Sequence, residues 1–180
     1  ALGPNRPFRD LAWGLASQGI AVLRYDKRTL VYKEKSANPI ESLTVQEETI
    51  DDALSAVALL RTTKGIDPDR VFVLGHSLGG MLIPRIGASD PLITGLIILA
   101  GNTRPLEDLI VIQSNYLAGA DGSISLAEKT EIDAITKQVE AIKALTPQDK
   151  SSKGLFIMGA PAAYWLDLRA YNQVETARSL

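Results

Sequence analysis

The stretch VFVLGHSLGGMLIPRI, residues 71–86, decides the fold. Its first four residues are apolar and predict a buried strand, and the pattern from residue 77 to residue 86 predicts a helix. Between them, GHSLG at residues 75–79 fits G-x-S-x-G, in which a serine occupies a sharp turn from strand to helix. Glycines two positions on either side leave room for that strained turn. The stretch predicts an α/β protein with Ser77 at the carboxyl edge of its sheet.

The rest of the first half alternates helix and strand patterns. Helical spacing predicts helices over residues 7–18 and 44–64, the second opened by the capping box TVQE. Apolar runs predict strands at residues 20–25 and 92–100, and the polar residues 27–43 predict a loop. Apolar strands that do not alternate and are separated by helices are typical of a parallel sheet covered on both faces.

The second half is helical apart from a weak apolar run at residues 155–158. Helical spacing predicts helices over residues 103–118, 125–145 and 162–171, and Pro161 suits the first turn of the last one. We therefore divide the chain into a core with the serine turn, residues 1–101, and a helical lid or cap region that leads back to the core, residues 102–180. An ordinary helical tail packed on the core is the alternative.

Length and composition narrow the classes of function. A chain of 180 residues with 46% hydrophobic and 22% charged residues is ordinary for one globular domain. The net charge is −2, from 19 basic and 21 acidic residues, so the chain lacks the excess of positive charge that is typical of nucleic-acid-binding proteins. No apolar run reaches the roughly 18–20 residues of a membrane helix, and the N-terminus ALGPNRPFRD does not resemble a signal peptide. We expect a soluble protein without a nucleic-acid partner or membrane span, and its compartment stays open.

The counts of cysteine and histidine restrict the chemistry further. With no cysteine there is no disulfide, thiolate nucleophile or cysteine metal site, and a single histidine excludes a metal centre built on several imidazoles. We therefore expect neither a metal nor a cofactor. A mechanism that needs a histidine base has one candidate within these residues, His76.

The serine turn carries the predicted chemistry. It would expose the Ser77 hydroxyl and aim the Leu78 backbone N–H, at the helix start, at the oxygen that becomes negative during acyl transfer. Ser77 is therefore the candidate nucleophile and Leu78 the candidate oxyanion donor. The alternative is a Gly- and Ser-rich turn whose hydroxyl caps the helix and has no chemistry.

The sequence resembles the α/β-hydrolases, and within them bacterial serine esterases. Beyond the GHSLG turn, the resemblance is carried by residues 7–29, 44–86 and 159–172. It implies a mainly parallel sheet flanked by helices with a helical lid insertion, and hydrolysis of short acyl or aryl esters through an acyl-serine intermediate. The implied partner is a small-molecule ester. A thioesterase or peptidase of the same fold is the runner-up, because all three classes form the same acyl intermediate.

The sequence departs from the family at the catalytic triad. The family order is serine, then acid, then histidine, and no histidine follows Ser77. We expect the triad acid and base outside residues 1–180, together with the second oxyanion donor, and a sheet that is incomplete at both chain ends. Neighbouring side chains diverge at such a turn, so His76 is expected to pack beside it as a hydrogen-bonded structural histidine. It is also a candidate substrate contact.

Other segments supply weaker candidates. Tyr164, Trp165 and Leu168, on the helix predicted over residues 162–171, are candidates for lining an acyl pocket, with simple core packing as the alternative. Residues 26–28 could border the site from the sheet edge, with a solvated loop of local ion pairs as the alternative. The acids inside the chain are interpreted as helix-start, turn and lid-helix residues: Asp108, Asp121 and Asp167.

A hypothesis of a different class is a non-catalytic remnant of such an enzyme. A sheet that lacks terminal strands leaves unpaired edges and exposed apolar surface, and both favour association. In that case the expected partner is a second copy of the chain, bound through the open sheet edges.

Overall fold

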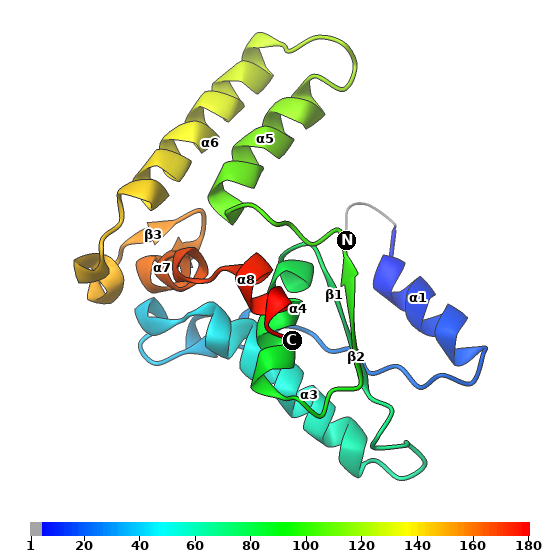
Figure 1. Ribbon diagram of the computed structural model, residues 1–180. Coiled ribbons are helices and arrows are strands. Elements are labelled where there is room, and N and C mark those ends of the chain that lie inside the picture. Colours follow the sequence, from blue (N-terminus) through cyan, green and yellow to red (C-terminus); the bar gives the residue numbers. More distant parts are fainter. Residues whose placement is uncertain (1–4) are drawn as a thin grey trace.

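The computed structural model of the chain describes residues 5–180 (Figure 1). The first four residues of the N-terminal stretch ALGPNRPFRD lie outside the described part. The helices and strands are, in chain order, α1 Pro7–Ala16, α2 Arg28–Tyr32, η1 Lys33–Ser36, η2 Ile40–Ser42, η3 Gln46–Ile50, α3 Asp51–Thr62, β1 Phe72–His76, α4 Leu78–Ser89, β2 Gly95–Leu99, α5 Leu106–Ala118, α6 Leu126–Ala144, η4 Pro147–Ser151, β3 Phe156–Ile157, β4 Ala160–Pro161, α7 Ala162–Ala170 and α8 Gln173–Arg178. The chain is therefore a mixed α/β protein that is mostly helical.

The strand, helix and strand predicted around the serine turn are confirmed. β1 pairs in parallel with β2, and His76 lies opposite Leu99. Backbone bonds extend the pairing at both ends, because the Ser77 N–H donates to the Leu99 carbonyl and the Thr94 N–H donates to the Val71 carbonyl, each at 2.9 Å. α4 connects the two strands and lies on one face of the pair, as Figure 1 shows.

The strand predicted at residues 20–25 is wrong. This segment has no regular secondary structure, and it pairs with no other strand in the described part of the chain. Its apolar side chains are between 38% and 51% exposed: Ile20, Val22, Leu23 and Tyr25. A strand forms only where a neighbour accepts and donates its backbone hydrogen bonds. Within residues 5–180 the parallel sheet therefore has two strands.

Two further expectations need correction. Residues 27–43, predicted as a loop, contain α2 and the short 3-10 helices η1 and η2. The sequence also contained an unrecognised helix, α8, which the Asn172 side chain caps by accepting from the N–H groups of Val174 and Glu175, each at 3.1 Å. These four helices are short, and a helix of one or two turns leaves little hydrophobic periodicity to detect in the sequence.

The long predicted helices are present, and their caps explain where two of them begin. In α6 the Ser125 hydroxyl accepts from the Glu128 N–H, and the Glu128 carboxylate accepts from the Ser125 N–H at 2.8 Å. The predicted TVQE start is also used, since the Glu47 carboxylate accepts from the Thr44 N–H at 2.9 Å. The helix that follows opens with the wide π turn η3 before it continues as α3.

One apolar core joins α3, α4 and α7. The largest of its fully buried side chains are Ile50 of η3, Leu82 and Ile83 of α4, and Ile142 of α6. α7 and α8 follow the α5–α6 hairpin in sequence, yet α7 contributes to this core and α8 packs on α4. Figure 1 shows the hairpin projecting away from the rest. The division of the chain at residue 101 stays a prediction.

Two glycines allow the close approaches around the serine turn. A Cβ at Gly75 would lie 2.3 Å from the Gly79 carbonyl oxygen, and a Cβ at Gly80 would lie 2.9 Å from the Gly101 Cα. Both neighbours are backbone, which cannot yield as a flexible side chain does. A Cβ at Gly79 meets no described atom within 4 Å. Packing thus requires a glycine at Gly75, the first glycine of the motif. At Gly79, the last one, a side chain would fit, and only the backbone takes part in the close contact.

We expect Gly75→Ala to lower the free energy of unfolding by about 3 kcal/mol, because overpacking against backbone forces β1 and α4 apart. Gly79→Ala is the matched control. It should leave stability unchanged or raise it by up to about 1 kcal/mol, since alanine is the better helix former. Urea unfolding followed by far-UV circular dichroism measures both variants. Equal losses in the two variants would contradict the packing argument.

Candidate functional site

Ser77 occupies the sharp turn that the motif predicts. Its backbone has φ 56° and ψ −119°, a conformation that residues with a Cβ rarely adopt. Two hydrogen bonds hold it there, because its N–H donates to the Leu99 carbonyl and its carbonyl accepts from the Met81 N–H, both at 2.9 Å. The strained serine is therefore fixed by β2 on one side and by the first turn of α4 on the other.

The Ser77 hydroxyl does not cap the helix that follows it. Ser77 precedes α4 directly, but its side chain makes no capping hydrogen bond, and the residue is exposed. This argues against the interpretation of the hydroxyl as a helix cap. Leu78 is the first residue of α4, and backbone N–H groups in a first helical turn have no acceptor in a preceding turn. Hydroxyl and N–H donor thus lie together at the positive end of the helix dipole.

His76 packs beside the turn as expected, but without the expected hydrogen bond. Its ring packs against the Phe8 ring of α1 in a T-shaped arrangement, with ring centroids 5.8 Å apart and planes at 73°. Within residues 5–180 the imidazole forms no hydrogen bond, and none joins it to Ser77. The described geometry therefore does not make His76 the base of Ser77, and its role as a substrate contact stays a prediction.

The three predicted pocket residues of α7 lie in the core. Tyr164, Trp165 and Leu168 are 7%, 4% and 2% exposed. The Tyr164 hydroxyl donates to a Glu48 carboxylate oxygen at 2.7 Å, and the Trp165 indole N–H donates to the Ile157 carbonyl at 2.8 Å. The structure thus brings them together in the core that α7 shares with α4. Their part in an acyl pocket stays a prediction.

A buried carboxylate that the sequence analysis did not single out holds Tyr164. Besides the Tyr164 hydroxyl, Glu48 accepts from the Thr29 hydroxyl at 2.8 Å and from the Lys27 ammonium at 3.2 Å. Burial raises the pKa of Glu48, but the charge of Lys27 and the three hydrogen bonds outweigh it and bring that pKa below its ordinary value. In sequence, Glu48 is one of several acids at a helix start, and no local signal marks its burial.

Residues 26–28 match the alternative of local ion pairs more closely than a free site border. Lys27 pairs with Glu48, and the Arg28 guanidinium contacts both carboxylate oxygens of Asp52. Lys27 thus connects the segment after residue 25 to η3, and Arg28 connects it to α3. The hydrogen bonds that Arg28 donates to the Asp52 carboxylate raise the pKa of Arg28.

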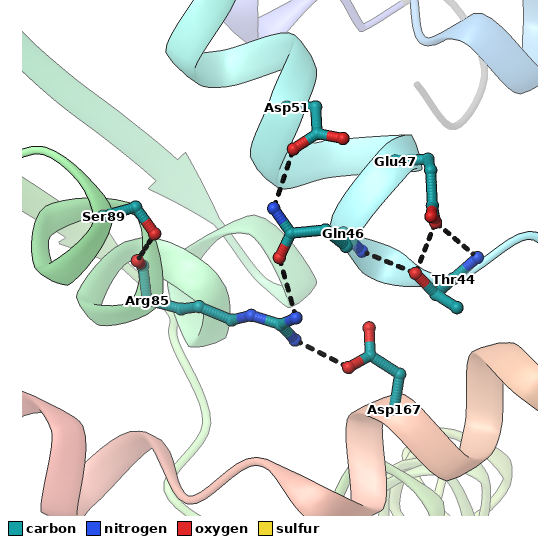
Figure 2. A network of polar contacts seen from close by, with 7 residues as sticks. All are labelled: Thr44, Gln46, Glu47, Asp51, Arg85, Ser89 and Asp167. Atoms are coloured by element: carbon teal, nitrogen blue, oxygen red, sulfur yellow. Dashed lines mark hydrogen bonds and ion pairs between the residues drawn. The ribbon is translucent and has the colours of Figure 1, made fainter.

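Asp108 and Asp121 have the helix-start and turn roles predicted for them, and the assignment of Asp167 to a lid helix stays a prediction. Asp108 lies in the first turn of α5 and forms an ion pair with Lys143 of α6. The Asp121 carboxylate accepts from the Ser123 N–H at 3.1 Å in the turn between the two helices. Asp167, on α7, pairs with Arg85 of α4 at 3.0 Å, as Figure 2 shows.

The two grooves found on the described part of the chain lie away from Ser77. They have volumes of about 450 and 300 Å³ and lie between α5 and α6, and Ser77 lines neither of them. The described residues contain no group of three or more histidine, aspartate or glutamate side chains that could hold a metal ion. None of the described helices combines the length and the apolar character needed to cross a membrane.

We expect the contribution of Glu48 to stability to be lost in acid. A carboxylate whose pKa is lowered on folding stabilises the protein at pH values above its ordinary pKa, and this stabilisation disappears as the pH falls through the lowered value. The stability difference between the native chain and Glu48→Gln should therefore shrink as the pH drops below the usual glutamate range. Urea unfolding at a series of pH values measures it.

Tyr164→Phe is the companion variant for this experiment. It removes a hydrogen bond to a charged acceptor and should cost about 1.5–3 kcal/mol at neutral pH. A constant difference between the native chain and Glu48→Gln across the acid range would contradict the assignment of a lowered pKa to Glu48.

Comparisons with known proteins agree with the geometry of the serine turn. Residues 6–159 match the family model described as serine aminopeptidase, S33. The chain is 41% identical over 179 residues to esterase EstD of Thermotoga maritima, an alignment that covers 99% of this chain and 39% of the relative. No solved structure matches significantly. Because the family model covers well over half of its residues, the chain belongs to the serine aminopeptidase S33 family of α/β-hydrolases.

Proposed function

We propose that this chain carries the nucleophile and one oxyanion donor of a serine ester hydrolase. The observation that supports this most directly is the strained, exposed Ser77, whose hydroxyl makes no capping bond at the start of α4. In the proposed reaction the Ser77 oxygen attacks the ester carbonyl while the Leu78 N–H stabilises the oxyanion. The bond to the alcohol then breaks, and water releases the acid from the acyl-serine.

The proposed substrate class is a small carboxylic ester with a short acyl or an aryl group. The relative in Thermotoga maritima is named an esterase, and this chain spans 39% of its length. The matching family is described as serine aminopeptidases, and that description favours a peptidase as the second candidate. Both classes attack an acyl carbon, so the serine turn alone supports either.

The proposed mechanism needs a base and an acid from outside residues 1–180. His76 is the single histidine of the chain, and its ring packs against Phe8. A second copy of the chain would bring the same histidine in the same place. We therefore propose that a histidine and an acid of other residues activate Ser77.

Substrate contacts are proposed for His76 beside the turn and for Tyr164, Trp165 and Leu168 of α7. The α7 side chains are almost fully buried, so they can reach an acyl group only if α7 shifts away from the core. In the proposed division, α7 belongs to the lid or cap region of residues 102–180.

We expect the 180-residue chain to hydrolyse nitrophenyl acetate at a rate near that of its Ser77→Ala variant, because no base activates the serine. Added imidazole should raise the rate of the native chain more than that of Ser77→Ala, since a free base can then remove the hydroxyl proton. Absorbance of released nitrophenol measures the rates, and intact mass measures the acetyl adduct.

Ser77→Ala controls for hydrolysis by imidazole itself, and nitrophenyl butyrate tests the length of the acyl group. A rate well above that of Ser77→Ala without imidazole would overturn the proposal that the base lies elsewhere. An acetyl group found only on residues other than Ser77 would overturn the proposed nucleophile.

The second proposal, of another class, is association through the open edge of β1. Phe72 and the β2 residues Ile97 and Ile98 are between 41% and 52% exposed, and β1 has a single strand partner within residues 5–180. Unpaired edges with apolar flanks favour pairing between copies. We expect size-exclusion chromatography to show a dimer or larger species whose fraction rises with concentration. A monomer at every concentration would contradict it.

A further inference from the structure

A polar joint connects the helix after the nucleophile to the buried helix near the C-terminus. The joint consists of Arg85 of α4, Gln46 of η3 and Asp167 of α7. Arg85 donates from Nη1 to the Asp167 carboxylate at 3.0 Å and from Nη2 to the Gln46 side-chain carbonyl at 2.8 Å. Figure 2 shows the guanidinium between the two acceptors. One side chain of α4 thus contacts two other elements.

Gln46 is itself held in one orientation. Its side-chain amide nitrogen donates to the Asp51 carboxylate at 2.7 Å, which leaves the carbonyl oxygen to face Arg85. Its backbone N–H donates to the Thr44 hydroxyl at 3.1 Å. Gln46 also begins the π turn η3, and such wide turns occur often at functional sites. The acceptor that meets Arg85 is therefore preoriented.

The same π turn holds α7 at a second point. Glu48, two residues after Gln46, accepts from the Tyr164 hydroxyl at 2.7 Å. Tyr164 and Asp167 are three residues apart on α7 and so lie on one face of the helix. Two contacts on one face fix both the rotation of α7 about its axis and its position along that axis.

The joint is not built for maximal stability. The side chains of Arg85 and Asp167 are 23% and 21% exposed, and partly buried ion pairs of this kind add little over well-packed apolar residues. The second carboxylate oxygen of Asp167 is buried and has no hydrogen-bond partner within residues 5–180, which is costly. What Arg85 adds is direction, since its planar fork places two donors at fixed angles.

We propose that Arg85 is a positioning residue that sets the register of α7 on the nucleophile helix α4. Through α7 it would set the distance between Ser77 and the predicted pocket side chains Tyr164, Trp165 and Leu168. The register stands on the contacts described, whereas its consequence for an acyl pocket rests on the proposed function.

Tryptophan fluorescence tests the register without any need for catalysis. The chain has two tryptophans, of which Trp165 on α7 is 4% exposed and Trp13 on α1 is 64% exposed. Trp13→Phe leaves Trp165 as the reporter of α7. In that background, Arg85→Met should raise the acrylamide quenching constant of Trp165 severalfold, toward that of exposed Trp13 measured in Trp165→Phe. The far-UV circular dichroism should keep its helical signal.

Arg61→Met is the matched control. Arg61 of α3 pairs with Asp90, and these side chains are 21% and 19% exposed. Within residues 5–180, no hydrogen bond or ion pair joins either side chain to α7. Removal of this pair should leave quenching of Trp165 unchanged. Arg85→Lys should give an intermediate value, because an ammonium can keep the pair with Asp167 without the second, fixed bond to Gln46.

Unchanged quenching in Arg85→Met, or an equal rise in Arg61→Met, would overturn the proposal. If Arg85→Met loses its helical signal, Arg85→Lys and Arg61→Lys take the places of the two variants, with an intermediate rise in quenching expected for Arg85→Lys and no change for Arg61→Lys. The quenching of Trp165 does not depend on the result of the ester assay. The proposal on the register and the proposed function can therefore be contradicted separately.

Discussion

The hydrogen bond from the Ser77 N–H to the Leu99 carbonyl is the constraint on which the rest depends. A serine at φ 56° costs of the order of 1–3 kcal/mol unless its surroundings impose that conformation. Here β2 holds the N–H, α4 holds the carbonyl, and the absence of a side chain at Gly75 lets the Gly79 backbone come close. If any of these were lost, the chain could relax and α4 would leave β1 at another angle.

The direction of α4 then determines where the C-terminal helices can attach. Its first turn accepts a hydrogen bond from the Tyr171 hydroxyl at the Met81 carbonyl, 3.1 Å away, and Arg85 holds α7 one turn later. Gln173 of α8 donates to the Asn102 carbonyl just beyond β2. The segment that follows the projecting hairpin is therefore fastened to the two elements that shape the serine turn. The serine turn and the C-terminal helices are thus joined through α4.

The elements that were predictable are those whose signal is local. The strand before Ser77, the helix after it and the long helices α5 and α6 carry apolar periodicity or capping residues within their own span. The segment at residues 20–25 has an equally strong apolar run, but a strand also needs a partner beside it, and none of the described segments supplies one. Composition predicts a tendency to pair, whereas pairing depends on neighbours.

The candidate site divides in the same way. By itself, the sequence determined the serine turn, because steric room at Gly75 and an apolar strand before it are properties of consecutive residues. Only the tertiary structure decided that His76 packs on Phe8, with no hydrogen bond to the imidazole within residues 5–180, and that the α7 side chains are buried. It also decided the partners of Glu48 and Arg85, which lie 116 and 82 residues away along the chain. Such contacts form only when distant segments pack together, so no local sequence pattern predicts them.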